Sequence, residues 1–147
     1  MPKYSNLGEI IHDIRHFNRF YTNLIGLLSR YRFDSTYTLA EARVILEIGI
    51  NDKYTITTLK EILKIDAGYL SRIVKRLIKS GIVEIEKSPS DNRINLLSLT
   101  KKGRQTLDYI NQMSDRQVEN IIENLSLDDL TKLISHMKSI ETILGKK

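Results

Sequence analysis

The chain has 147 residues, of which 41% are hydrophobic and 28% charged, and it contains two prolines and no cysteine. This composition is typical of a globular domain, and it excludes disulfides, thiolate nucleophiles and thiolate metal sites. Residues 53–104 hold 12 Lys and Arg against 5 Asp and Glu, whereas the rest hold 11 against 13, within a net charge of +5. This basic segment favours a polyanionic partner, with a solvated surface as the alternative.

Between Ser5 and Arg30, apolar residues recur at steps of three and four, which predicts one long amphipathic helix. At this length the helix would extend about 40 Å, beyond the body of so small a domain. We therefore expect part of its apolar stripe to contact a second chain. Because apolar runs are short and the N-terminus lacks a signal-peptide core, we also expect a cytoplasmic protein.

Three shorter segments follow. Thr38 and Glu41 form a capping-box pattern that opens a helix reaching about Gly49. Residues 54–56 are predicted to form a very short strand, and the next helix is expected to be capped at Thr57 or Thr58.

Asp66 is expected to cap the following helix, whose apolar stripe ends at Gly81, a residue suited to a left-handed position. The connection around residues 64–65 is tight. Two helices joined in this way predict a helix-turn-helix.

After this helix the pattern changes to alternation over residues 82–86, turn formers over 88–92 and a second β-prone run over 94–99, which together predict a β-hairpin. Thr100 is expected to cap a fifth helix. Ser126 begins another capping pattern, before a sixth helix that Gly145 closes.

This order of elements predicts a mainly α fold with a minor β component, in which a winged helix-turn-helix core (38–103) carries N- and C-terminal helical dimerisation arms (5–30 and 104–145). We expect residues 1–147 to form one domain of this type. The segment Asp91–Gly103, DNRINLLSLTKKG, resembles the Asp-x-Arg, Leu-x-Leu-Thr-x-x-Gly wing signature of MarR-type regulators. The resemblance extends over nearly the whole chain, and it implies a dimeric DNA-binding transcriptional regulator, in particular a ligand-responsive repressor.

The helix over residues 66–80 presents small side chains first and cations afterwards, opposite its apolar stripe. Small residues allow the backbone to approach the floor of the major groove, and Arg72 has the reach for a bidentate contact to guanine. A solvated Lys and Arg face is the alternative. The DNA-binding candidates of this helix are Ala67, Gly68, Tyr69, Ser71, Arg72, Lys75 and Arg76.

At the tip of the hairpin, Arg93 is predicted to enter the minor groove, and Asp91 to hold its guanidinium in one direction. The alternative is a surface ion pair in a turn; the MarR resemblance, in which this pair shapes the wing, favours the DNA-binding interpretation. Contacts to phosphates are expected from Lys87, Ser88, Lys101 and Lys102.

A two-fold dimer would place two recognition helices about 34–36 Å apart along the DNA and so match a pseudo-palindromic operator. A monomer whose helical arms pack back on themselves is the alternative. The candidate dimerisation residues lie on the first and last helices: Leu7, Ile10, Ile11, Ile14, Leu133, Ile134, Met137, Ile140 and Leu144.

The resemblance also implies a small anionic aromatic effector, for which Arg15, His16, Arg19 and Tyr37 are candidates, although an ordinary helix surface explains them equally well. His12 and His16 stand four residues apart, a spacing that permits metal chelation with His136 as a third ligand, but exposed helical histidines are common. We expect no metal and no cofactor.

No phosphate loop, His-Glu-x-x-His motif or serine elbow is present, so we expect no enzyme. Residues 66–72 resemble MarR-like modules that are sometimes fused to an acetyltransferase, but we expect no such domain in this protein. The competing function is a winged-helix module that binds a protein without reading a DNA sequence.

Overall fold

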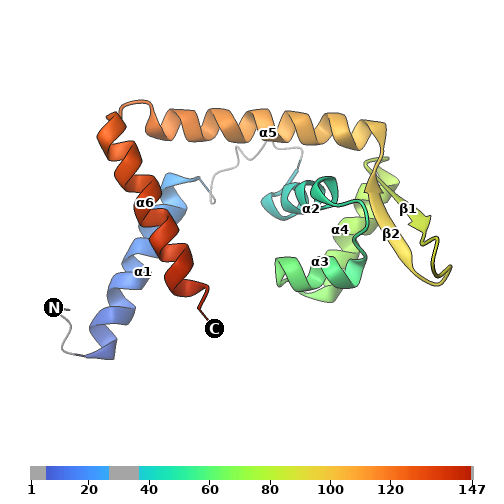
Figure 1. Ribbon diagram of the computed structural model, residues 1–147, viewed down its shortest axis with the longest axis horizontal. Coiled ribbons are helices and arrows are strands. Elements are labelled where there is room, and N and C mark those ends of the chain that lie inside the picture. The colour runs from blue at the N-terminus through green and yellow to red at the C-terminus, as the bar shows by residue number, and fades with distance from the viewer. Residues whose placement is uncertain (1–5, 27–36, 147) are drawn as a thin grey trace. The chain divides into compact units, whose positions relative to one another are not determined.

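The computed structural model describes residues 6–26 and 37–146 (Figure 1). Contacts divide the chain into two compact units, Met1–Ser114 and Asp115–Lys147. The predicted fold class is confirmed: helices dominate, and the β component is a two-stranded antiparallel hairpin. The elements are α1 (Leu7–Leu24), α2 (Leu39–Ile50), α3 (Ile56–Leu63), α4 (Ala67–Lys79), β1 (Val83–Lys87), β2 (Asn95–Leu99), α5 (Lys101–Ile122) and α6 (Leu127–Leu144).

The hydrophobic core lies in the first unit, where α2, α3, α4 and the hairpin meet. The apolar stripe of α4 is directed into this core, which leaves its basic face in solvent. Burial of large aliphatic side chains in this way is the main stabilising contribution to such a fold. The largest fully buried side chains are Ile45, Ile48, Leu59, Leu70, Leu77, Ile82 and Leu97.

Local sequence signals set most helix boundaries. Thr38 and Glu41 form the predicted capping box, and the Asp66 carboxylate accepts a hydrogen bond from the backbone N–H of Tyr69 at 3.0 Å. Gly81 takes a positive φ of 74° directly after α4, as expected. The predicted cap of α3 is wrong: Thr55, not Thr57 or Thr58, accepts from the Thr58 N–H at 3.1 Å.

The reason for this difference lies in the hairpin. Tyr54 forms an isolated antiparallel bridge to Leu97, which limits the predicted short strand to one residue and allows the helix to begin earlier. Within the hairpin, Val83 pairs with Leu99 and Lys87 with Asn95. The tip is therefore formed by residues 88–94.

The first helix is shorter than the sequence predicts. It begins after Asn6 and ends at Leu24, because Ile25 leaves the helical conformation and Gly26 adopts a φ of 67°. The remaining residues of the predicted range, 27–30, lie outside the described part, as does Ser5. Within residues 6–26 and 37–146, no helix has the length and apolar content needed to cross a lipid bilayer.

A set of contacts between the end of α4 and the start of α5 forms what we call the α4–α5 clasp, made by Ser80, Gly81, Thr100, Lys102 and Gly103. Thr100 caps α5 by accepting from the Gly103 N–H, and its hydroxyl donates to the Gly81 carbonyl at 2.5 Å. The ammonium of Lys102 donates to the Ser80 carbonyl at 2.8 Å. The clasp fixes the last turn of α4 against the first turn of α5.

Candidate nucleic-acid interface

The N-terminal turn of α4 exposes small side chains. Ala67 and Gly68 are both exposed, and a β-carbon at Gly68 would lie 3.1 Å from the Asp66 carboxylate oxygen that caps the helix. The absence of that β-carbon leaves both the cap and the backbone unobstructed. This turn can therefore approach another surface closely, as base reading in a major groove requires.

The cations of α4 lie on the face opposite its core stripe. Arg72, Lys75 and Arg76 are exposed, while Ser71 is half-buried. The Arg72 guanidinium lies over the ring of Tyr69, 5.9 Å from its centroid, and Tyr69 itself is 41% exposed. The predicted DNA-binding residues of this helix thus share an accessible surface.

Arg76 differs from the other cations of α4 because it is ion-paired with Glu41 of α2. Glu41 is only 4% exposed, and its other carboxylate oxygen accepts from the Thr38 N–H at 3.3 Å. Arg76 therefore joins α4 to α2, and its charge is partly neutralised. The sequence indicated Glu41 as a helix cap but gave no signal of this pair, since the partners are separated by 35 positions.

Arg76→Ala is expected to lower the free energy of unfolding by about 2 kcal/mol, because it leaves the buried Glu41 carboxylate without its cation. Lys75→Ala, which removes a neighbouring exposed charge, should change it by less than about 0.5 kcal/mol. Urea denaturation followed by circular dichroism measures both. Equal stability of the two variants would show that the ion pair between Arg76 and Glu41 does not stabilise the fold.

The hairpin tip holds one guanidinium in a fixed direction. The Asp91 carboxylate accepts from the Arg93 backbone N–H at 3.0 Å and from the Arg93 side chain at 3.2 and 3.4 Å. The Arg93 side chain is nevertheless 90% exposed. The pKa of Asp91 lies below its ordinary value, because these backbone and side-chain donors stabilise the ionised carboxylate.

A carboxyl group whose pKa is lowered in the folded wing stabilises that conformation above its ordinary pKa, and the contribution disappears as the pH falls through the lowered value. In Arg93→Ala the side-chain donors are lost but the backbone N–H remains. We therefore expect the pKa of Asp91 to rise in this variant and still stay below its ordinary value. A carbon-detected NMR titration measures it, and an identical Asp91 titration in both proteins would contradict the role of the Arg93 side chain.

The four residues predicted to contact phosphates differ in how accessible they are. Lys87 is exposed and donates to the Asn95 amide oxygen at 2.7 Å. Ser88 is 7% exposed, with its hydroxyl 3.0 Å from that of Ser90, so a phosphate contact would require this pair to separate. Lys101 is exposed, whereas Lys102 is held in the α4–α5 clasp.

The effector and metal candidates lie apart from this surface in the sequence. Arg15, His16 and Arg19 are exposed on α1, and Tyr37 is half-buried against the core. His12 contacts Asp13 at 3.2 Å. Among residues 6–26 and 37–146, no three His, Asp or Glu side chains are grouped as metal ligands.

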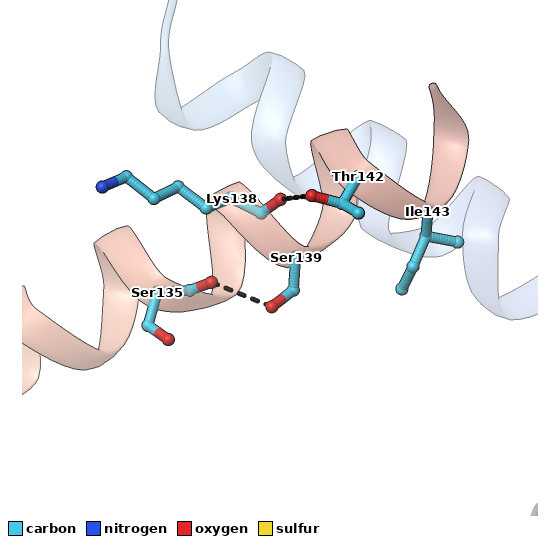
Figure 2. A pocket seen from close by; sticks show the side chains of 5 residues that line it. All are labelled: Ser135, Lys138, Ser139, Thr142 and Ile143. Atoms are coloured by element: carbon cyan, nitrogen blue, oxygen red, sulfur yellow. Dashed lines mark hydrogen bonds between the residues drawn. The ribbon is translucent and has the colours of Figure 1, made fainter. Parts of the chain in front are cut away.

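An open hollow of about 430 Å³ lies along α6 (Figure 2). The Ser139 hydroxyl donates to the Ser135 carbonyl at 3.0 Å, and the Thr142 hydroxyl to the Lys138 carbonyl at 2.9 Å. These donors are therefore already engaged within the helix. The hollow is lined by Ser135, Lys138, Ser139, Thr142 and Ile143, and by none of the effector candidates.

Comparison with known proteins identifies the family to which this chain belongs. The model of the MarR family matches residues 35–94, which include α4 and the hairpin tip. The regulator SarZ of Staphylococcus saprophyticus is 32% identical over 69% of this chain and 70% of its own length. The chain belongs to the MarR family.

A second relative supports the assignment, both by its sequence and by its solved structure. The multiple antibiotic resistance protein MarR of Escherichia coli is 29% identical over 91% of this chain and 90% of its own length. A crystal structure of a mutant E. coli MarR complexed with operator DNA superposes with a TM-score of 0.72 at 28% identity, covering 92% of this chain and 99% of that one. The resemblance of this chain to the MarR family is thus confirmed.

Proposed function

We propose that this protein is a dimeric, sequence-specific DNA-binding transcriptional repressor. One observation carries the proposal: in the same unit, α4 exposes a cationic face while the hairpin tip holds the exposed Arg93 in a fixed direction. A helix of this kind suits the major groove, and a fixed guanidinium suits a narrow minor groove. The complex of a mutant E. coli MarR with operator DNA supports this function for a relative of the chain.

The dimeric state is inferred from the apolar faces of the terminal helices. On α1, Leu7, Ile11 and Ile14 are 69%, 47% and 55% exposed, and on α6 Ile134 and Leu144 are 53% and 75% exposed. No residue of either helix is buried. Apolar surface on this scale requires a partner, and a second copy of the chain supplies the matching faces.

We further propose that DNA binding responds to a small anionic aromatic ligand and that the chain has no catalytic activity. The support for the ligand is the exposed pair of cations Arg15 and Arg19 on α1, with the imidazole of His16 exposed between them in the sequence. Such a ligand changes DNA affinity only if it binds the two conformations of the dimer unequally. The relatives are transcriptional regulators, which supports the absence of catalysis.

The decisive experiment is selection of genomic DNA fragments by the purified protein in the presence of competitor DNA, with and without simple aromatic carboxylates. The proposal predicts recovery of fragments that share a pseudo-palindromic sequence, bound by two chains at a stoichiometry measured by sedimentation. Recovery of unrelated fragments with equal, weak affinity would overturn it and favour a protein-binding module.

A further inference from the structure

The arginine nearest the exposed N-terminal turn of α4 rests on an aromatic ring. Tyr69 and Arg72 are three residues apart, a spacing that places side chains next to each other on a helix surface. The guanidinium carbon lies 5.9 Å from the ring centroid, within the range of a cation–π interaction. The Tyr69 backbone N–H is bonded to the Asp66 cap, which fixes the turn that carries the ring.

Arg72 is held differently from the other two arginines of the candidate interface. Arg76 is paired with Glu41 and Arg93 with Asp91, so that a carboxylate sets the direction of each guanidinium. Among the residues that the structure describes, the Arg72 guanidinium lies over the aromatic ring of Tyr69 and not beside a carboxylate. An aromatic ring restricts the guanidinium without adding a negative charge that would repel DNA, and it leaves the nitrogen donors available for a base.

We propose that Tyr69 is a positioning residue that determines sequence specificity by holding the Arg72 guanidinium in the direction from which it reads a base pair. This inference rests on the proposed function and deepens it. A guanidinium already restricted before binding loses less conformational freedom when it forms a bidentate contact. The restriction of Arg72 therefore increases the affinity for the correct base pair, and it does not change the contacts to phosphates.

The size of the effect follows from the exposed position of the pair. A cation–π interaction at such a site corresponds to a change of about twofold to fivefold in an equilibrium constant. Tyr69→Leu should reduce the ratio of affinities for the selected operator and for its single base-pair variants by this factor. Tyr69→Phe, which keeps the ring, should preserve the ratio.

The test is a double-mutant cycle with Tyr69→Leu, Arg72→Ala and the combined variant, using fluorescence anisotropy on an operator recovered by genomic selection. Because Tyr69 acts through Arg72, Tyr69→Leu should have no further effect on specificity in the Arg72→Ala background. The dependence of affinity on salt should be the same in Tyr69→Leu and the original protein, since no phosphate contact is removed. We expect Tyr69→Leu to keep the melting temperature of the original protein, which shows that its loss of specificity does not come from a loss of stability.

Three results would overturn the proposal. If Tyr69→Leu lowers specificity equally in the Arg72→Ala background, the ring itself contacts DNA. If Tyr69→Phe behaves as Tyr69→Leu, the hydroxyl is responsible. If the Arg72 δ-protons of the free protein show no upfield ring-current shift that disappears in Tyr69→Leu, the ring does not hold the guanidinium. The last measurement needs no DNA, so it tests this inference independently of the proposed function. Failure of the proposed function would instead appear as equal affinity of the original protein for all DNA fragments.

Discussion

Gly103→Ala is expected to lower the free energy of unfolding by about 3 kcal/mol, at the upper end of what overpacking of a buried site costs. A β-carbon at this position would overlap the Ile82 carbonyl oxygen and lie 3.2 Å from the Leu99 β-carbon. The carbonyl is not free to move, because it accepts a hydrogen bond from the Thr100 N–H at 3.0 Å. The start of α5 must therefore shift, and the α4–α5 clasp with it.

The second consequence of this substitution concerns DNA. Because Lys102 and Thr100 connect α5 to the end of α4, we expect Gly103→Ala to weaken operator binding even where the protein remains folded. Gln105→Ala is the matched control, since this side chain is exposed in the same turn of the helix. Urea denaturation and anisotropy measure the two effects, and a Gly103→Ala protein as stable as Gln105→Ala would show that the contact at Ile82 is not tight.

The combined variant Arg72→Ala/Arg93→Ala is expected to bind its operator at least about thirtyfold more weakly, because each substitution removes an interaction worth about 1–3 kcal/mol and the two together remove at least about 2 kcal/mol. Arg72→Ala should in addition relax the preference for one base pair. Neither side chain is buried, so we expect the folded dimer to persist. Fluorescence anisotropy measures the affinity, and sedimentation verifies the dimer.

Lys53→Ala/Lys60→Ala removes the same charge from the basic segment and serves as the control. Both lysines are exposed, and a loss of phosphate contacts there should weaken binding to all DNA sequences alike. If the arginine variant in a folded dimer kept the affinity of the original protein, the interface assigned to α4 and the hairpin tip would be wrong. If it weakened binding only as much as the control, without loss of base preference, these arginines would not read sequence.

Much of the candidate interface could be predicted because its determinants are local. The Asp66 cap, the apolar stripe of α4 and the left-handed Gly81 each depend on residues within one helix or one turn. The same holds for Asp91 and Arg93, which are two residues apart and form their hydrogen bonds within the hairpin tip. Hydrophobic period and capping chemistry suffice to place such features.

Other features depended on neighbours that are distant in sequence. Thr55 caps α3, and not Thr57 or Thr58, because Tyr54 forms a bridge to Leu97. Arg76 connects α4 to α2 because α2 places the Glu41 carboxylate beside it. Even the Tyr69–Arg72 pair, although local, required side-chain conformations that spacing alone does not select.

By itself, then, the order of helices, caps and hairpin along the chain determined a winged helix-turn-helix and the candidate surface that we propose binds DNA. Only the tertiary structure decided which cations of that surface remain available and which are bound by a buried carboxylate or a backbone carbonyl. It also decided that a β-carbon at position 103 would meet the Ile82 carbonyl unless the backbone shifts. The physical reason is that periodicity and capping act between residues a few positions apart, whereas burial, ion pairing and close backbone approach arise between segments that folding alone brings together.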